Sequence, residues 1–274
     1  MAKRILVAVI CVPILICVML FLPTICWALV VTFISGMAAH ELLNTAGEGK
    51  VTVPMRVMSL LSAVLIPLGV WFGWAVPVAA VCVFAVLAVS FWCAIRAYNE
   101  GNVSIGFYHV MLTLFAGSVI PLGLSSLVHL RQMEYARYLV LLAVFLNFAV
   151  DAVAYFGGIF LGKHRGITRV SPKKSLEGYI FGFLGGALFA ILFGLVIGAI
   201  EDCSVNPWSL ALCGLLGALF TELGDLVFSF IKRQYNIKDY GRLLPGHGGM
   251  LDRFDSMILC APVVLIIVTY LPVF

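Results

Sequence analysis

Charged residues are scarce in this chain. Asp, Glu, Lys and Arg make up only 11% of its 274 residues, whereas 63% are hydrophobic and the mean hydropathy is +1.12. Since about 25% of the residues in a soluble domain are charged, this shortage excludes a soluble globular protein. The composition instead predicts an all-α, polytopic integral membrane protein.

Closely spaced cysteine pairs are also missing. None of the eight cysteines forms a C-x-x-C pair, and nearly all of them fall inside apolar runs. This pattern argues against a cysteine-based metal site and against a disulfide framework. Because a free thiol is small and apolar, we interpret the cysteines as packing or lipid-facing residues. They are Cys11, Cys17, Cys26, Cys82, Cys93, Cys203, Cys213 and Cys260.

Long apolar runs dominate what is present. A bilayer core of about 30 Å needs about 20 apolar residues per helix, and this criterion predicts nine spans. They cover residues 5–22, 24–44, 54–70, 74–96, 104–124, 136–158, 178–200, 207–231 and 252–273. The first span follows Lys3 and Arg4, as in a signal peptide, but no small-x-small cleavage site comes after it. We therefore expect it to remain as a span.

The basic residues predict the orientation of these spans. With the N-terminus in the cytoplasm, 15 of the 17 Lys and Arg residues lie on the cytoplasmic side and only Arg131 and Arg137 lie outside. The positive-inside rule favours this orientation and puts the C-terminus outside. Two longer cytoplasmic loops, 162–178 and 232–249, are rich in basic residues. Such loops can simply maintain topology or contact anionic lipid.

Acidic residues inside the predicted spans gather in the second half of the chain. Three spans carry them: Asp151, Glu222, Asp225, Asp252 and Asp255. Asn147, Asp151 and Tyr155 follow one another at i, i+4 and i+8 and predict a polar stripe on one helix face. Glu222 and Asp225, like Asp252 and Asp255, have i, i+3 spacing. A carboxylate at the bilayer centre costs about 2.5–3.5 kcal/mol, so these residues are expected to face a cavity and a partner.

The acids and the neighbouring basic loops indicate phosphate chemistry. Carboxylate oxygens suit Mg²⁺, which commonly takes one or two carboxylates together with substrate phosphates. Lys and Arg side chains and the backbone N–H groups of glycine-rich loops bind phosphate oxygens. The combination predicts phosphoryl or nucleotidyl transfer to a lipid at the membrane surface.

A cation-coupled transporter or channel is the alternative from another class, because intramembrane acids also form ion pathways and proton relays. Transporters commonly place polar sites between two repeated halves. No internal repeat is evident in this sequence, and the first five spans hold almost nothing ionisable beyond Glu41, near the end of the second.

Two sequence blocks resemble the phosphatidate cytidylyltransferases, the CDP-diacylglycerol synthases. The first is SFIKRQYNIKDYGRLLPGHGGMLDRFD (229–255), in which every fixed residue of the family's C-terminal signature is present. The second runs from Asp151 through Gly157, Gly162 and Lys163 to SPKKSLEG (171–178). Ser175 and Leu176 replace the family's usual threonine and tryptophan, and Ala152 stands where a small polar residue is common. The first five spans match the family only in general character.

The resemblance implies that the phosphate of phosphatidic acid attacks the α-phosphorus of CTP, giving CDP-diacylglycerol and pyrophosphate. It also implies a requirement for Mg²⁺, room for a monovalent cation such as K⁺, and a homodimer among membrane lipids with its site open to the cytoplasm. A bacterial inner-membrane protein is expected, with no nucleic-acid partner. A related kinase or cytidylyltransferase with another lipid acceptor is the closest enzymatic alternative. The D-G-x-x-A-R motif of the CDP-alcohol phosphotransferases is absent.

The resemblance and the intramembrane acids together predict the site residues. The predicted catalytic residues are Asp225, Asp252, Lys232 and Arg253. The predicted substrate-binding residues are Ser171, Lys173, Lys174, Ser229, Arg233, Lys238, Asp239, His247, Gly248, Gly249 and Asp255. The predicted metal ligands are Asp225 and Asp252, with Asp151 and Glu222 as further candidates. Helix–helix salt bridges are the alternative role for the acids, and a solvated basic face is the alternative for the lysines. Residues 1–135 are expected to form a scaffold and residues 136–274 the catalytic half.

We expect Asp252→Asn to abolish turnover while the protein still folds into membranes, because the amide lacks the charge that a metal ligand needs. Formation of CDP-lipid by membranes containing equal amounts of each protein measures this. Full activity in the variant would contradict the predicted role.

Overall fold

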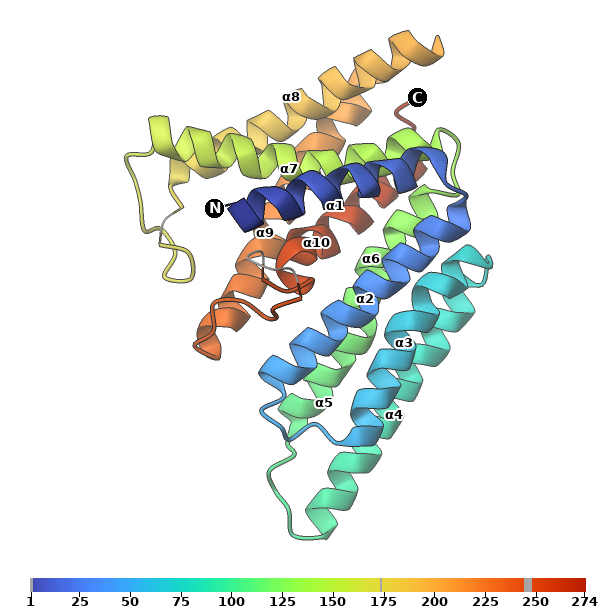
Figure 1. Cartoon of the computed structure of the whole chain (residues 1–274), viewed down its shortest axis with the longest axis vertical. Helices are drawn as coiled ribbons and strands as arrows, with labels where there is room; N and C mark the ends of the chain where they lie inside the picture. The colour runs from blue at the N-terminus through green and yellow to red at the C-terminus, as the bar shows by residue number, and fades with distance from the viewer. Residues whose placement is uncertain (1, 173, 244–247) are drawn as a thin grey trace. The chain divides into compact units, whose positions relative to one another are not determined.

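The computed structural model describes residues 2–172, 174–243 and 248–274, most of which are helical (Figure 1). The helices are α1 (Ala2–Phe21), α2 (Thr24–Ala46), α3 (Val53–Trp71), α4 (Ala75–Asn99), α5 (Phe107–Leu114), the π-helical turn η1 (Phe115–Val119), α6 (Ile120–Leu130), α7 (Ala136–Phe160), α8 (Leu176–Glu201), α9 (Pro207–Gln234) and α10 (Leu251–Tyr270). The described residues contain no β-strand, and an isolated bridge joins Arg165 and Ser175. The predicted all-α class is confirmed.

Each predicted span coincides with a helical segment, and the span predicted at 104–124 continues through α5, η1 and α6 to Leu130. Within the described residues, seven segments are long and apolar enough to cross a membrane. These are α2, α3, α4, the segment Phe107–Leu130, α7, α8 and α9. The chain is therefore a polytopic membrane protein, while crossing by α1 and α10, and with it the total of nine, stays a prediction.

The chain forms two compact units. The first consists of Met1–Gln132 and Tyr235–Phe254, and the second of Met133–Gln234 and Asp255–Phe274. Helix α10 thus begins in the first unit and continues in the second. The first unit takes in the segment 235–254 from the second half of the sequence. The functional division at residue 135 remains a prediction.

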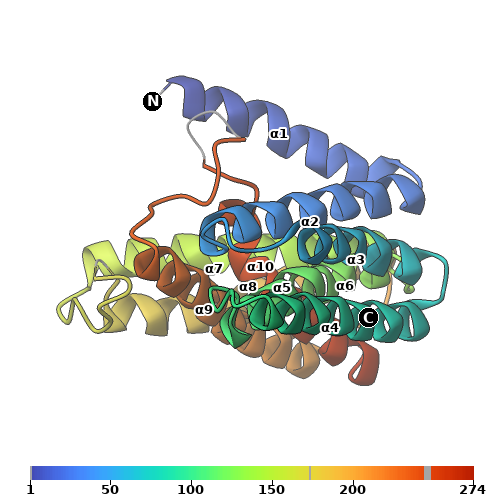
Figure 2. The same cartoon turned by 90° about the horizontal axis from the view of Figure 1, so that it is seen from below.

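The first unit is built on α2, α3, α4 and the α5–η1–α6 segment, which pack side by side (Figure 2). Trp27 is fully buried and donates its indole N–H to the carbonyl oxygen of Leu127 at 3.0 Å. Next to the π-helical turn, the hydroxyl of Ser59 donates to the carbonyl oxygen of Thr113 at 3.0 Å. The hydroxyls of Thr113 and Ser90 lie 2.8 Å apart. These bonds satisfy polar groups where the regular helix is interrupted.

In the second unit, α7, α8 and α9 pack together through glycines. A Cβ added at Gly186 of α8 would lie 2.8 Å from the carbonyl oxygen of Gly214 on α9. Gly182 faces Ala154 of α7, and Gly194 faces Leu210 of α9. The spaced glycines of α8 therefore serve packing within the chain, as their spacing predicts.

Helix α8 begins at a side-chain cap. The Ser175 hydroxyl accepts a hydrogen bond from the N–H of Gly178 at 3.1 Å. A serine at this position satisfies one of the N–H groups that a helix leaves unpaired at its start. Ser175, which replaces the threonine of the resembled motif, therefore supplies the cap of α8.

We expect Gly214→Ala to lower the midpoint of thermal unfolding in detergent by about 5 °C, because a new Cβ would meet backbone atoms of α8 and push the helices apart. The clash is severe, since the nearest atom, the carbonyl oxygen of Gly186, would lie only 2.4 Å away. Gly36→Ala in α2 is the matched control, because its Cβ would meet nothing closer than Val64 at 3.7 Å. Equal stability of the two variants would contradict this packing.

Candidate functional site

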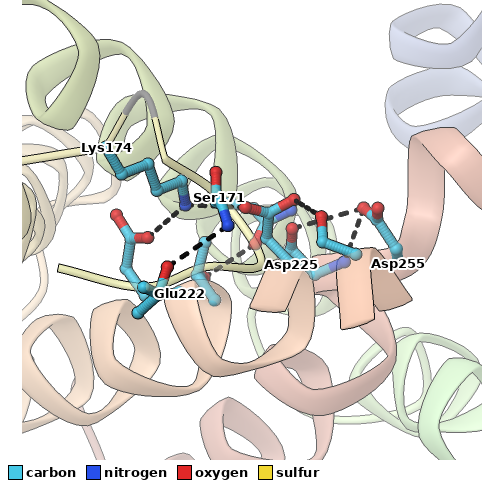
Figure 3. Close-up of polar contacts among 10 residues, drawn as sticks. Ser171, Lys174, Glu222, Asp225 and Asp255 are labelled. Atoms are coloured by element: carbon cyan, nitrogen blue, oxygen red, sulfur yellow. Dashed lines mark hydrogen bonds and ion pairs between the residues drawn. The ribbon is translucent and has the colours of Figure 1, made fainter. Parts of the chain in front are cut away.

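Lys174 lies at the centre of an ion cluster in the second unit (Figure 3). Its Nζ is 2.5 Å from Oε2 of Glu222 and 2.7 Å from Oδ2 of Asp225. Glu222 and Asp225 lie one turn apart on α9 and point to the same side of that helix, as their i, i+3 spacing predicts. Lys174 reaches them from the segment just before α8. The structure therefore brings together three predicted site residues.

The surroundings of the cluster favour a charged lysine. The side chain of Glu222 is 9% exposed, and those of Lys174 and Asp225 are each 26% exposed. Burial alone would lower the pKa of the Lys174 ammonium, but the carboxylates of Asp225 and Glu222 outweigh it and raise that pKa above its ordinary value. Nζ also lies 5.3 Å from the centre of the Tyr179 ring, within range of a cation–π interaction.

The cytoplasmic end predicted for α9 carries further polar contacts. Ser229 lies one turn after Asp225, and its hydroxyl donates to Oδ1 of Asp225 at 3.4 Å. Lys232 Nζ is 3.8 Å from Oδ2 of Asp255 on α10. The Arg233 guanidinium donates from Nε to the carbonyl oxygen of Val170 at 3.3 Å. Residues from both predicted sequence blocks therefore meet in this unit.

A cavity of about 660 Å³ opens beside the ion cluster. Its lining comes from α7, from the segment before α8 and from α8 and α9: Asp151, Ala154, Tyr155, Gly158, Ile159, Arg165, Pro172, Lys174, Ser175, Gly178, Tyr179 and Glu222. Asp151 and Tyr155, two members of the predicted polar stripe, line it together. The third, Asn147, instead accepts a hydrogen bond from Thr221 of α9 at 2.7 Å. Apolar walls with a few ionisable groups among them are typical of ligand-binding sites.

In the first unit, Asp252 organises the glycine-containing part of the signature. Its Oδ2 accepts the N–H of Tyr240 at 2.8 Å and the N–H of Gly249 at 3.0 Å. Gly248 has φ of +87°, a left-handed backbone conformation that favours glycine. Lys238 and Asp239 are exposed on the same segment. The described residues of the signature around Asp252 therefore form a hydrogen-bonded backbone with exposed charged side chains beside it.

The remaining predicted residues stand as follows. Ser171 lies next to the ion cluster (Figure 3), its N–H bonded to the Thr168 hydroxyl at 3.2 Å, and Arg253 is exposed at the start of α10. Lys173 and His247 lie outside the described residues. Asp225 and Asp252 belong to different units, so their pairing around a metal stays a prediction.

Sequence reasoning did not select three residues that the structure places at these features. Arg165 and Tyr179 line the cavity, and Glu41 of α2 contacts the signature backbone. Arg165 stood among several equivalent basic residues of one loop. Glu41 was conspicuous only as the lone acid in the first five spans.

The donor set of the ion cluster suits a hard divalent cation. No group of three or more His, Cys, Asp or Glu side chains forms a ready metal cluster among the residues that the structure describes. However, Oε1 of Glu222 is buried without a hydrogen-bond partner in that part of the chain. A buried carboxylate oxygen in that condition is unfavourable unless a cation or water satisfies it. Carboxylates such as Glu222 and Asp225 are therefore chemically compatible with Mg²⁺.

Fold and site together define an integral membrane protein with ionisable groups clustered beside an apolar cavity. The chain belongs to the cytidylyltransferase family, whose model matches residues 2–271.

Relatives named phosphatidate cytidylyltransferase occur in several bacteria. The Mycobacterium bovis protein is 34% identical over 272 residues, which cover 94% of this chain and 85% of the relative. The Rickettsia typhi protein is 35% identical over 185 residues, covering 67% of this chain and 77% of the relative. The Staphylococcus epidermidis protein is 38% identical over 161 residues, covering 59% of this chain and 60% of the relative.

We expect Lys174→Met to lower the midpoint of thermal unfolding by about 5 °C or more, because it leaves two partly buried carboxylates without their cation. Lys50→Met is the matched control, since Lys50 pairs with Glu48 at 2.9 Å between side chains that are 43% and 51% exposed. Such an exposed pair contributes little to stability. Tryptophan fluorescence during heating in detergent compares the two variants. The expectation fails if they unfold at the same temperature.

Proposed function

We infer that this chain is a CTP:phosphatidate cytidylyltransferase, which converts CTP and phosphatidic acid into CDP-diacylglycerol and pyrophosphate. The family match over nearly the whole chain is the observation that carries this conclusion. Relatives of that name at about 34–38% identity, and the complete signature at residues 229–255, support it. The family assignment does not favour the transporter alternative.

The reaction forms one bond and breaks one. An oxygen of the lipid phosphate attacks the α-phosphorus of CTP, and the bond between that phosphorus and the oxygen bridging to the β-phosphate breaks, releasing pyrophosphate. Because the lipid phosphate is already an anion, the protein hardly needs a general base. Catalysis then depends on positioning two polyanions and neutralising their charge.

The cavity of the second unit has the chemistry for phosphatidic acid. Its apolar wall, which includes Ile159 and Ala154, suits the glycerol and the first carbons of the acyl chains. Arg165 and Lys174, on the same lining, can bind the phosphate. The bidentate geometry of a guanidinium is well suited to a phosphate group, and a lysine ammonium adds a compact charge. We therefore assign the lipid headgroup to the part of the cavity that Arg165 and Lys174 line.

The signature is the proposed binding site for CTP. Gly248 has a left-handed backbone without a side chain, which allows close approach of a polyphosphate. Gly249, whose N–H donates to Asp252, supports this backbone. Lys238 and Arg253 are exposed and can neutralise phosphate charge. His247 belongs to the same motif by sequence.

Mg²⁺ is the proposed cofactor, in keeping with the resemblance and the carboxylate chemistry. Asp225 and Glu222 would hold it in the second unit, with Asp151 as a further candidate, and the signature predicts Asp252 as a ligand. When bound, the ion would neutralise charge on the phosphates. Titration of the protein with Mn²⁺ alone, followed by electron paramagnetic resonance, would detect the site without turnover. Asp225→Asn should weaken that binding.

The finer features of its membrane setting are proposals as well. The bacterial relatives and the distribution of basic residues support a place in the inner membrane with the site facing the cytoplasm. A homodimer surrounded by membrane lipids is proposed from the resemblance.

The reaction predicts pyrophosphate release by the purified protein in detergent only when CTP, Mg²⁺ and phosphatidic acid are all present, together with a CDP-lipid product. Omitting each component in turn tests the requirement. Release of pyrophosphate with another lipid phosphate but not with phosphatidic acid would indicate a different acceptor. No turnover by folded protein with any lipid phosphate would contradict the proposed function.

The same assay reports orientation, because CTP does not cross a membrane. Sealed inverted vesicles should form product from external CTP, whereas right-side-out vesicles should do so only after they are opened. The reverse pattern would contradict the cytoplasmic orientation.

A further inference from the structure

A glutamate on α2 holds the start of α10 from a distant part of the sequence. Glu41 lies near the C-terminal end of α2 and is only 6% exposed. Its Oε1 accepts the N–H of Met250 at 2.9 Å, and its Oε2 accepts the N–H of Leu251 at 2.8 Å. Both carboxylate oxygens are therefore engaged by backbone that follows more than 200 residues later.

The backbone around this carboxylate is closely fitted. We call the described segments 240–243 and 248–251 the loop stems. A Cβ added at Gly241 would lie 2.3 Å from Oε1 of Glu41, and one at Gly249 would lie 2.4 Å from Oε2. Thr45, one turn beyond Glu41, donates from its hydroxyl to the carbonyl oxygen of Tyr240 at 3.3 Å. Helix α2 thus fixes both loop stems, and glycine is required at two positions to admit the glutamate.

The charge of Glu41 suits its place. The first N–H groups of α10 have no partner within the helix, and the positive end of the helix dipole favours an anion there. Oδ2 of Asp252 accepts the N–H groups of Tyr240 and Gly249. Two carboxylates therefore engage four N–H groups of the loop stems. Hydrogen bonds to a charged acceptor are stronger than those to a neutral one, especially away from water.

We propose that Glu41 is a positioning residue for nucleotide binding. It does not contact substrate; its carboxylate fixes the loop stems in the conformation that presents Gly248 to the phosphates of CTP. This inference rests on the proposed function, in which the signature binds CTP. A purely structural role would lower stability without changing one substrate's KM selectively. Positioning predicts a selective effect on CTP.

Glu41→Gln tests the proposal with little change in size. A glutamine can accept hydrogen bonds only through its oxygen, and its NH₂ group would face a backbone N–H. We expect the midpoint of thermal unfolding to fall by about 5 °C, because a buried N–H loses its acceptor. Below that midpoint, KM for CTP should rise at least about tenfold, while KM for phosphatidic acid stays close to the wild-type value. Hydrogen exchange followed by mass spectrometry should show faster exchange in the peptide that covers 240–251.

Glu48→Gln is the matched control. Glu48 lies just after α2 in the same unit, its side chain is 51% exposed, and it pairs with Lys50 outside the loop stems. Both kinetic constants and the exchange of the 240–251 peptide should match the wild type. An equal effect of the two variants would overturn the proposal, because it would show a general response to losing a negative charge.

Gly241→Ala disturbs the same contact by changing the loop stem and not the glutamate. It replaces Glu41→Gln in the test if that variant does not fold. Its Cβ would displace the Glu41 carboxylate, so the same selective rise in KM for CTP is expected. Wild-type KM for CTP and wild-type exchange in whichever variants fold would overturn the proposal. If the wild-type protein itself shows no CTP-dependent turnover, the proposed function fails separately. The exchange measurement then still decides whether Glu41 holds the loop stems.

Discussion

The placement of ionised groups within an apolar helix bundle is the constraint on which the second unit depends. Glu222 is almost completely buried, and an unpaired carboxylate in such surroundings costs several kcal/mol. Lys174 supplies the required cation, and the next residue, Ser175, caps α8. Two consecutive residues therefore establish the ion pairs and the start of α8, Lys174 the first and Ser175 the second. This coupling explains why the segment between α7 and α8 folds back against α9.

The first unit uses carboxylates in a different way. Asp252 and Glu41 bind backbone N–H groups, which carry no net charge, and so hold the loop stems in place. In the second unit the carboxylates of Glu222 and Asp225 face an ammonium group, and their interaction is mainly ionic. An acid in a membrane protein can thus serve as a structural acceptor or as part of an electrostatic site. The group that the carboxylate contacts, a backbone N–H or an ammonium, distinguishes the two roles.

The sequence predicted those features that depend on local spacing. Apolar runs marked each helix, and the i, i+3 spacing placed Glu222 and Asp225 on one face. The sequence did not reveal contacts between distant segments. Helical periodicity indicates which face of a helix a residue occupies, but not which segment packs against that face. The contact of Glu41 with the start of α10 is of this kind. The sequence also did not indicate which basic residue of the loop pairs with Glu222 and Asp225, because the neighbours of Lys174 include basic residues of the same chemistry.

Helix α8, which begins beside the ion cluster, has an almost wholly apolar surface. Between Glu177 and Glu201 it carries no ionisable group except the Tyr179 hydroxyl, its inner face is lined with glycine, and aliphatic side chains such as Leu184, Leu188 and Leu192 are exposed along its outer face. Such a helix offers no polar path from the lipid side. Glu222 and Lys174 line the cavity. A lipid that enters the cavity would therefore displace water from these two groups and lower the local dielectric constant around them, which strengthens their electrostatic interactions.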